Sequence, residues 1–185
     1  PSPTLFRSAA AAHSLAGRGG VDWRGRGAAL TASPPDPDFD GVSHSEGAAY
    51  GPVNGQPFIQ SDQDGVDVHA NDVTQGAIGD CYLMASLAAI ARQDPEAIRR
   101  MVRSNDDGTY TVTLYERGGF FGTELQPVEV VVPAEFPLRD GGPIFAHPGA
   151  AADGQQELWP MLIERAYAQR HGGYDGIVGG LAYFD

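Results

Sequence analysis

The chain has 185 residues, a formal net charge of −12 and an apolar content of 42%, which is typical of a globular protein. Residues 1–60 hold four arginines and five acids (−1), whereas residues 61–185 hold eight arginines and nineteen acids (−11). The acidic second part excludes nucleic acid as an expected partner, and no apolar run suits a membrane span or a signal peptide.

Residues 1–60 are rich in proline, glycine and alanine and show no persistent apolar periodicity. Such a composition predicts a linker or a disordered tail. Residues 61–185 are enough for one domain with a modest core. We therefore expect a boundary near residue 60. A single cysteine fits a reducing compartment without excluding secretion, so the localisation stays open.

The only cysteine, Cys81, stands where an apolar helix is expected to begin, with Asp80 as a favourable N-cap and an end near Ala91. The positive end of a helix favours a thiolate, which is the nucleophilic form of cysteine. Gln75, six residues upstream, could join the Cys81 backbone N–H as an oxyanion donor. This spacing alone leaves both a catalytic nucleophile and a buried core cysteine open.

The following segments predict an α+β domain, with helices grouped around a small antiparallel sheet. A cap, a proline and an acid at residues 94–96 mark the start of a second helix. Apolar residues alternate with threonines over residues 109–114, which predicts a half-buried strand. A second strand is expected over residues 128–132, before the pairing is ended by Pro133 and Pro137.

Two further elements are expected near the end of the chain. Phe145 is expected to lie in a third, short strand. A long helix is predicted from about residue 156 to residue 170, and the pair Gly172-Gly173 is expected to stop it.

The second part of the chain contains two motifs whose order along the chain is informative. Residues 75–81 read Gln-Gly-x-x-Gly-Asp-Cys and precede an aromatic residue, and residues 157–168 read Glu-Leu-Trp-Pro-Met-Leu-Ile-Glu-Arg-Ala-Tyr-Ala. In this order they resemble the nucleophile segment and the Glu-x-Trp segment of calpains, the papain-like cysteine endopeptidases. The resemblance covers about residues 60–185. Tyr82 departs from it, because calpains usually have tryptophan at that position.

The resemblance implies a papain-like, cysteine-bearing subdomain in which Cys81 attacks polypeptide substrates and Gln75 holds the oxyanion. Calpains take their catalytic histidine and asparagine from a second subdomain far downstream. His147 resembles a structural histidine of the cysteine-bearing half, and no asparagine follows it in the chain. We therefore expect the nucleophile half of a calpain-like endopeptidase, which is inactive alone and needs a histidine-bearing partner half.

Two other functions remain open. A truncated pseudoprotease could serve as a peptide-binding, Ca²⁺-responsive module. Another papain-like acyl transfer is a third possibility, although the Glu-x-Trp and Gly-Asp-Cys motifs favour calpains over it.

Acidic residues gather at positions 62, 64, 67 and 72, just before the nucleophile segment. Such a run is usually a solvated loop, but carboxylates and carbonyls are also the ligands that Ca²⁺ prefers. The calpain resemblance implies a Ca²⁺ site at this place. Its ligands would be the backbone carbonyls of Gly65 and Asp67 and the side chains of Asp72 and Glu157.

Overall fold

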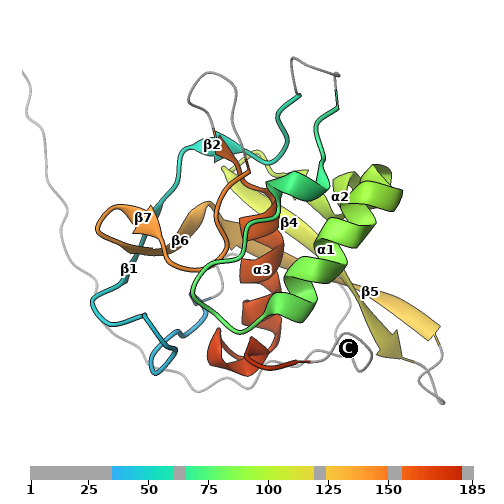
Figure 1. Ribbon diagram of the computed structural model, residues 1–185. Coiled ribbons are helices and arrows are strands. Elements are labelled where there is room, and N and C mark those ends of the chain that lie inside the picture. Colours follow the sequence, from blue (N-terminus) through green and yellow to red (C-terminus); the bar gives the residue numbers. More distant parts are fainter. Residues whose placement is uncertain (1–34, 61–65, 119–123, 150–155, 181–185) are drawn as a thin grey trace, which may run out of the picture. The chain divides into compact units, whose positions relative to one another are not determined.

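The computed structural model describes residues 35–60, 66–118, 124–149 and 156–180 (Figure 1). All of them belong to one compact unit. Its helices are α1 (Cys81–Gln93), α2 (Pro95–Met101) and α3 (Trp159–Arg170), with the 3-10 turns η1 (Ala70–Asp72) and η2 (Asp175–Ile177).

The strands form three small sheets. Antiparallel pairing joins β1 (Ala49–Pro52), β6 (Glu135–Arg139) and β7 (Gly142–Pro143), in that order, and likewise β3 (Val102–Ser104), β4 (Thr109–Gly118) and β5 (Glu124–Pro133). The two-residue strands β2 (Gly55–Gln56) and β8 (Gln156–Glu157) pair in parallel. Helices beside small sheets confirm the α+β class expected from the sequence.

Most predicted elements are present with shifted ends. The side chain of Asp94 accepts a hydrogen bond from the Ala97 N–H at 3.2 Å, so α2 begins at its predicted cap. The long helix α3 begins three residues late, because residues 156 and 157 are paired in β8. Two expectations are wrong: Pro137 lies within β6, and Phe145 lies in a bend outside any strand.

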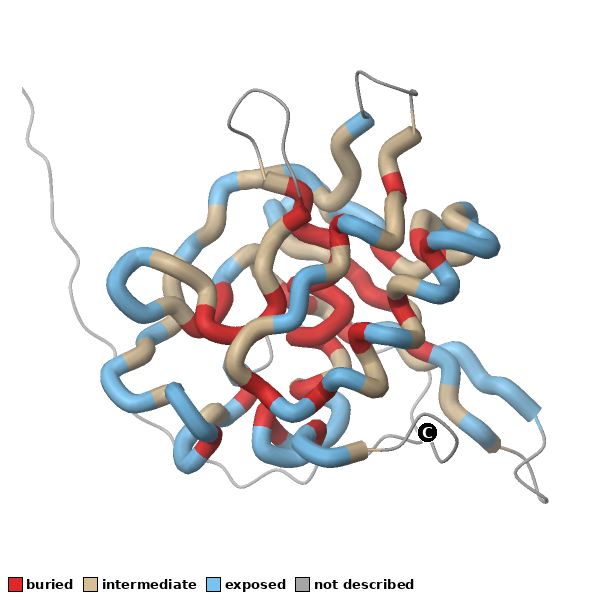
Figure 2. The backbone as a smooth tube through the Cα atoms, in the orientation of Figure 1, coloured by how far each residue is buried: buried red, intermediate tan, exposed pale blue. Residues whose placement is uncertain are grey.

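The core is formed where α3 contacts α1 and the sheet of β3, β4 and β5. Figure 2 shows α3 buried along its length, whereas the far end of the β4–β5 hairpin is exposed. Trp159, at the first position of α3, has no exposed surface. A second, smaller cluster surrounds Phe145 and Tyr174. The buried helix α3 is therefore the central element of the core, and the segments that form the site pack around it.

The folded unit includes residues that the sequence assigned to the linker. Strand β1 pairs with β6, and the Tyr50 hydroxyl donates a hydrogen bond to the Pro37 carbonyl at 2.7 Å. The fully buried Arg165 of α3 binds the Asp36 carboxylate and the Glu135 carbonyl and lies over the Tyr50 ring. The expected boundary at residue 60 therefore falls after this packed segment. Residues 1–34 lie outside the described part of the chain.

Within the described residues, no helix is both long and apolar enough to cross a membrane.

Candidate active site and cation site

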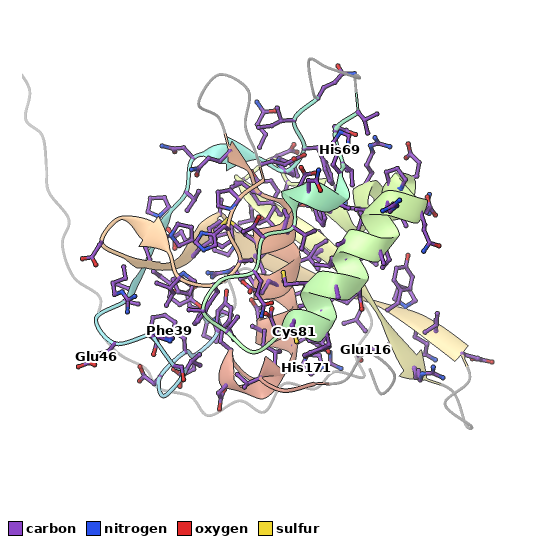
Figure 3. The ribbon with its side chains drawn as sticks, viewed as in Figure 1. Phe39, Glu46, His69, Cys81, Glu116 and His171 are labelled. Carbon is purple, nitrogen blue, oxygen red and sulfur yellow. The ribbon has the colours of Figure 1, made fainter. Side chains whose placement is uncertain are left out.

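Cys81 is exposed at the first position of α1 (Figure 3). The preceding Asp80 is the N-cap residue, but its side chain makes no capping hydrogen bond and has no exposed surface. Its carbonyl instead accepts the N–H groups of Leu83 and Met84 at 2.8 and 3.2 Å. The first N–H groups of a helix have no acceptor within the helix, and the Cys81 N–H is one of them. Because Cys81 is exposed, it is not the buried core cysteine that its spacing alone had left open.

Gln75 is exposed on the loop that leads to Cys81. Its side-chain Nε2 donates a hydrogen bond to the Ile78 carbonyl at 2.6 Å, which holds the amide over the loop. An amide nitrogen carries two hydrogens, and the Gln75 amide also lies within hydrogen-bonding reach of the Asp80 carboxyl. A cavity of about 480 Å³ opens beside Gln75 and is lined by residues that include Arg139, Asp140 and His147.

The nucleophile loop lies directly against residues 144–147. The Ala77 N–H binds the Ile144 carbonyl at 2.8 Å, and the His147 N–H binds the Thr74 carbonyl at 2.9 Å. A Cβ on Gly76 would lie 1.9 Å from the Phe145 carbonyl oxygen, so only glycine permits this approach. Backbone hydrogen bonds and this close backbone approach therefore fix the nucleophile loop against residues 144–147.

Tyr82 joins the other side of the nucleophile to the end of the described chain. Its hydroxyl donates to the Ile177 carbonyl at 3.1 Å. Its ring fills the space beside Gly180, where an added Cβ would lie 2.3 Å from Cζ. The Gly179 N–H also binds the Gly79 carbonyl at 2.8 Å. A tyrosine therefore provides the packing beside Cys81 for which calpains usually have tryptophan.

Two of the four expected calcium ligands lie together. Asp72 and Glu157 are 6% and 3% exposed, and a Cβ on Gly149 would lie within 3.0 Å of atoms of both side chains. The carboxylate of Asp72 accepts the His69 N–H at 2.5 Å, and that of Glu157 accepts the Ile59 N–H at 3.1 Å. Burial and the neighbouring Asp72 charge raise the pKa of Glu157 to about 8.

The other two expected ligands are the backbone carbonyls of Gly65 and Asp67, of which the structure describes only the second residue. Asp67 directs its side chain to Arg99, whose Nε donates to it at 2.7 Å, and this hydrogen bond lowers the pKa of Asp67. Gly65 lies outside the described residues. In the described part, no three histidine, cysteine or acidic side chains form a metal cluster. A cation between Asp72 and Glu157 would therefore need main-chain oxygens.

In the described part of the chain, no hydrogen bond joins Cys81 to a histidine. His69 lies beside η1, well away from Cys81 (Figure 3). His147 lies on the cavity beside Gln75. His171 follows α3; its ring packs on Tyr167 with centroids 4.1 Å apart, and its Nδ1 lies 2.9 Å from the Tyr167 carbonyl oxygen.

Sequence reasoning missed Glu164, which lies in α3 and is 2% exposed. Both of its carboxylate oxygens lie near the Ala146 N–H, at 3.0 and 3.1 Å. Burial, and next the charge of Asp80, raise the pKa of Glu164 well above its ordinary value. The sequence did contain a sign of this role, because Glu164 stands within an otherwise apolar stretch. Burying an acid there is costly unless it has a partner.

Comparison with known proteins agrees with this geometry. Residues 57–183 match the model of the calpain family of cysteine proteases. The chain is 34% identical over 115 residues to the mouse calpain-2 catalytic subunit, covering 59% of this chain and 15% of that protein. It is 33% identical over 117 residues to the maize calpain-type cysteine protease DEK1, covering 62% of this chain and 5% of that protein.

The human calpain-1 catalytic subunit is 33% identical over 115 residues, covering 59% of this chain and 14% of that protein. The chain thus corresponds to 15% or less of the length of these curated relatives. The family match spans well over half of the chain and includes both motifs read from the sequence. This chain belongs to the calpain family of cysteine proteases.

Proposed function

We propose that this chain is the nucleophile-bearing part of a cysteine endopeptidase. The Cys81 thiolate attacks the carbonyl carbon of a peptide bond, and the carbonyl oxygen becomes an oxyanion. That oxyanion accepts hydrogen bonds from the Gln75 side-chain amide and from the backbone N–H of Cys81. The C–N bond then breaks, the amine leaves with a proton, and the acyl group stays on sulfur as a thioester. Water hydrolyses this thioester, which releases the acid and restores the thiol.

The observation that supports this proposal is the exposure of Cys81 at the start of α1, together with the anchored amide of Gln75. The proton of the thiol and the leaving amine need a histidine, and a second group must orient it. His69 lies well away from Cys81 (Figure 3), and the Nδ1 of His171 lies 2.9 Å from the Tyr167 carbonyl oxygen. We propose that both groups come from a histidine-bearing subdomain and that this chain alone is inactive.

Complementation tests the catalytic roles. The chain alone should react with iodoacetamide at Cys81 but leave casein uncleaved. Mixed with a histidine-bearing calpain subdomain, it should cleave casein, and C81S should abolish this. Q75A should lower kcat by about 10²–10³-fold, as loss of one oxyanion donor does elsewhere.

Q93A, which alters an exposed glutamine at the other end of α1, is the matched control and should keep full activity. Cleavage by the chain alone would contradict the need for a second subdomain. A stable complex that binds peptides without cleaving them, with Cys81 still alkylated, would favour the peptide-binding module instead.

We propose further that Asp72 and Glu157 hold Ca²⁺, with main-chain carbonyls, including those of Gly65 and Asp67, completing the ligand set. The donor set fits this cation, because two buried carboxylates face each other and each has a backbone N–H donor. A divalent cation between the two carboxylates would neutralise their negative charges. Because Glu157 also precedes α3, such a site would join the segment before the nucleophile loop to that helix.

Calcium addition should raise the melting temperature. At a concentration 100 times the dissociation constant, binding stabilises a folded protein by about 2.7 kcal/mol. D72N and E157Q should each abolish the shift. D106N, which alters an exposed acid in the turn before β4, should retain it. An unchanged melting temperature at millimolar Ca²⁺ would show that the wild-type site does not bind calcium.

A further inference from the structure

Two buried acids beneath the nucleophile loop have no part in the chemistry proposed above. Asp80 immediately precedes Cys81 and has no exposed surface. Glu164 comes from the middle of α3 and is 2% exposed. The two carboxyl groups lie within hydrogen-bonding reach of each other. They connect the loop that bears the nucleophile with the most buried helix of the unit.

The hydrogen-bond donors around this pair are too few for two carboxylates. Both oxygens of Glu164 share the single N–H of Ala146. Neither oxygen of Asp80 receives a hydrogen bond from any group in the described part of the chain. A buried carboxylate without donors is strongly unfavourable, and two adjacent ones more so. A hydrogen on one of the two carboxyls would supply the missing donor.

The groups that surround the pair do not neutralise it. Arg165, the next residue of α3, uses its guanidinium for Asp36 and for the Glu135 carbonyl. The hydroxyl of Tyr174 is buried nearby without a partner among the described groups. The Gln75 amide is near enough to lower the pKa of Asp80, but burial outweighs it and raises that pKa.

We propose that Asp80 and Glu164 share one proton and act as a positioning pair that holds the nucleophile loop on α3. The pair touches three segments that meet below Cys81, namely the loop, α3 and residues 144–147. Hydrogen bonds already join the last of these to the loop at Ala77 and Thr74. The positioning role rests on the catalytic function proposed for Cys81, whereas the shared proton does not depend on it.

The shared proton has a consequence for stability that can be measured. In the unfolded chain both acids ionise near pH 4, whereas in the folded chain one proton stays bound at higher pH. Folding therefore takes up a proton over this range. The stability of the fold should fall as the pH rises from about 4 until the pair loses its proton.

The test uses the full chain and the variants E164Q and D80N, in which an amide replaces one acid and can donate to the other. E129Q makes the same change at an exposed position of β5 and is the matched control. The infrared comparison is made in the E157Q background, because buried Glu157, whose pKa is raised to about 8, would also be protonated at pH 7. In E157Q, with or without E129Q, the spectrum at pH 7 should contain the C=O stretching band of a buried protonated carboxyl. Both E164Q and D80N should lack it, while keeping the fold.

The pH dependence of Cys81 alkylation distinguishes a role of the pair in positioning the nucleophile loop from a role in packing alone. In wild type and E129Q the rate of Cys81 alkylation by iodoacetamide should show two titrations, one from the thiol and one from the pair. In E164Q only one should remain, and at pH 7 the rate should stay within about threefold of wild type because the amide restores the hydrogen bond. The melting temperature of E164Q should also lose the pH dependence assigned to the pair.

A carboxylic-acid band that is absent from the E157Q protein, or that survives there in either E164Q or D80N, would overturn the shared proton. A single titration in wild type would overturn the positioning role. If E164Q or D80N fails to fold, the infrared band and the melting curve of E157Q across pH still decide the first question. Failure of casein cleavage after complementation would overturn the proposed function alone and leave the infrared result unaffected.

Discussion

Replacing Arg165 with alanine is expected to lower the free energy of unfolding by about 3–5 kcal/mol, because a buried charged network loses its central member. The guanidinium has no exposed surface, binds the Asp36 carboxylate and the Glu135 carbonyl, and lies 4.6 Å from the Tyr50 ring centroid. Its loss leaves the carbonyl without this donor and a void beside the ring. Chemical unfolding measures the change, and limited proteolysis should show earlier cleavage between residues 36 and 50.

R170A is the matched control on the same helix. Arg170 is 42% exposed and pairs with the equally accessible Glu116, so its removal should cost less than about 1 kcal/mol. Equal effects of the two substitutions would show that residues 36–50 are not held by Arg165. The comparison thus also tests how far the folded unit extends toward the N-terminus.

Replacing Gly76 with alanine is expected to displace the nucleophile loop and destabilise the fold by about 1–3 kcal/mol, the typical cost of an overpacked site. The added methyl would lie 1.9 Å from the Phe145 oxygen, which belongs to the backbone and cannot rotate away. Either the loop or residues 144–147 must move. Unfolding measures the cost, and the rate of Cys81 alkylation should change because the loop ends at that residue.

G142A provides the control for Gly76. Gly142 has no positive φ angle, and the nearest atom to an added Cβ is the Arg139 oxygen at 3.9 Å, an ordinary contact. This variant should unfold within about 0.5 kcal/mol of wild type, as neutral surface changes do. If G76A were equally stable, the close approach of the loop to Phe145 would not hold in solution.

Local signals predicted the helices well. The Asp94-Pro95-Glu96 start and the glycines after residue 171 depend on backbone groups within a few positions, and the structure places α2 and the end of α3 accordingly. Asp80 was expected to cap α1 with its side chain, but its carboxyl turns inward to Glu164. That choice depends on a residue 84 positions away, which no local pattern contains.

Strands were predicted less well, for a related reason. The alternating residues 109–114 form β4, since periodicity alone places one face on the core. Residues 49–52 have no such pattern, yet they pair with β6. Short strands of this kind form because a distant segment offers hydrogen-bond partners, which composition cannot show.

The sequence by itself determined the family and the α+β class, and it selected Cys81 as the nucleophile that we propose, because a motif is a local arrangement of residue types. Only the tertiary structure decided which acids meet. Asp72 approaches Glu157, and Asp80 approaches Glu164, because β8 and α3 carry these glutamates into the interior, far along the chain from the two aspartates. Burial then changes the chemistry of these carboxyls, and burial exists only once distant segments have packed together.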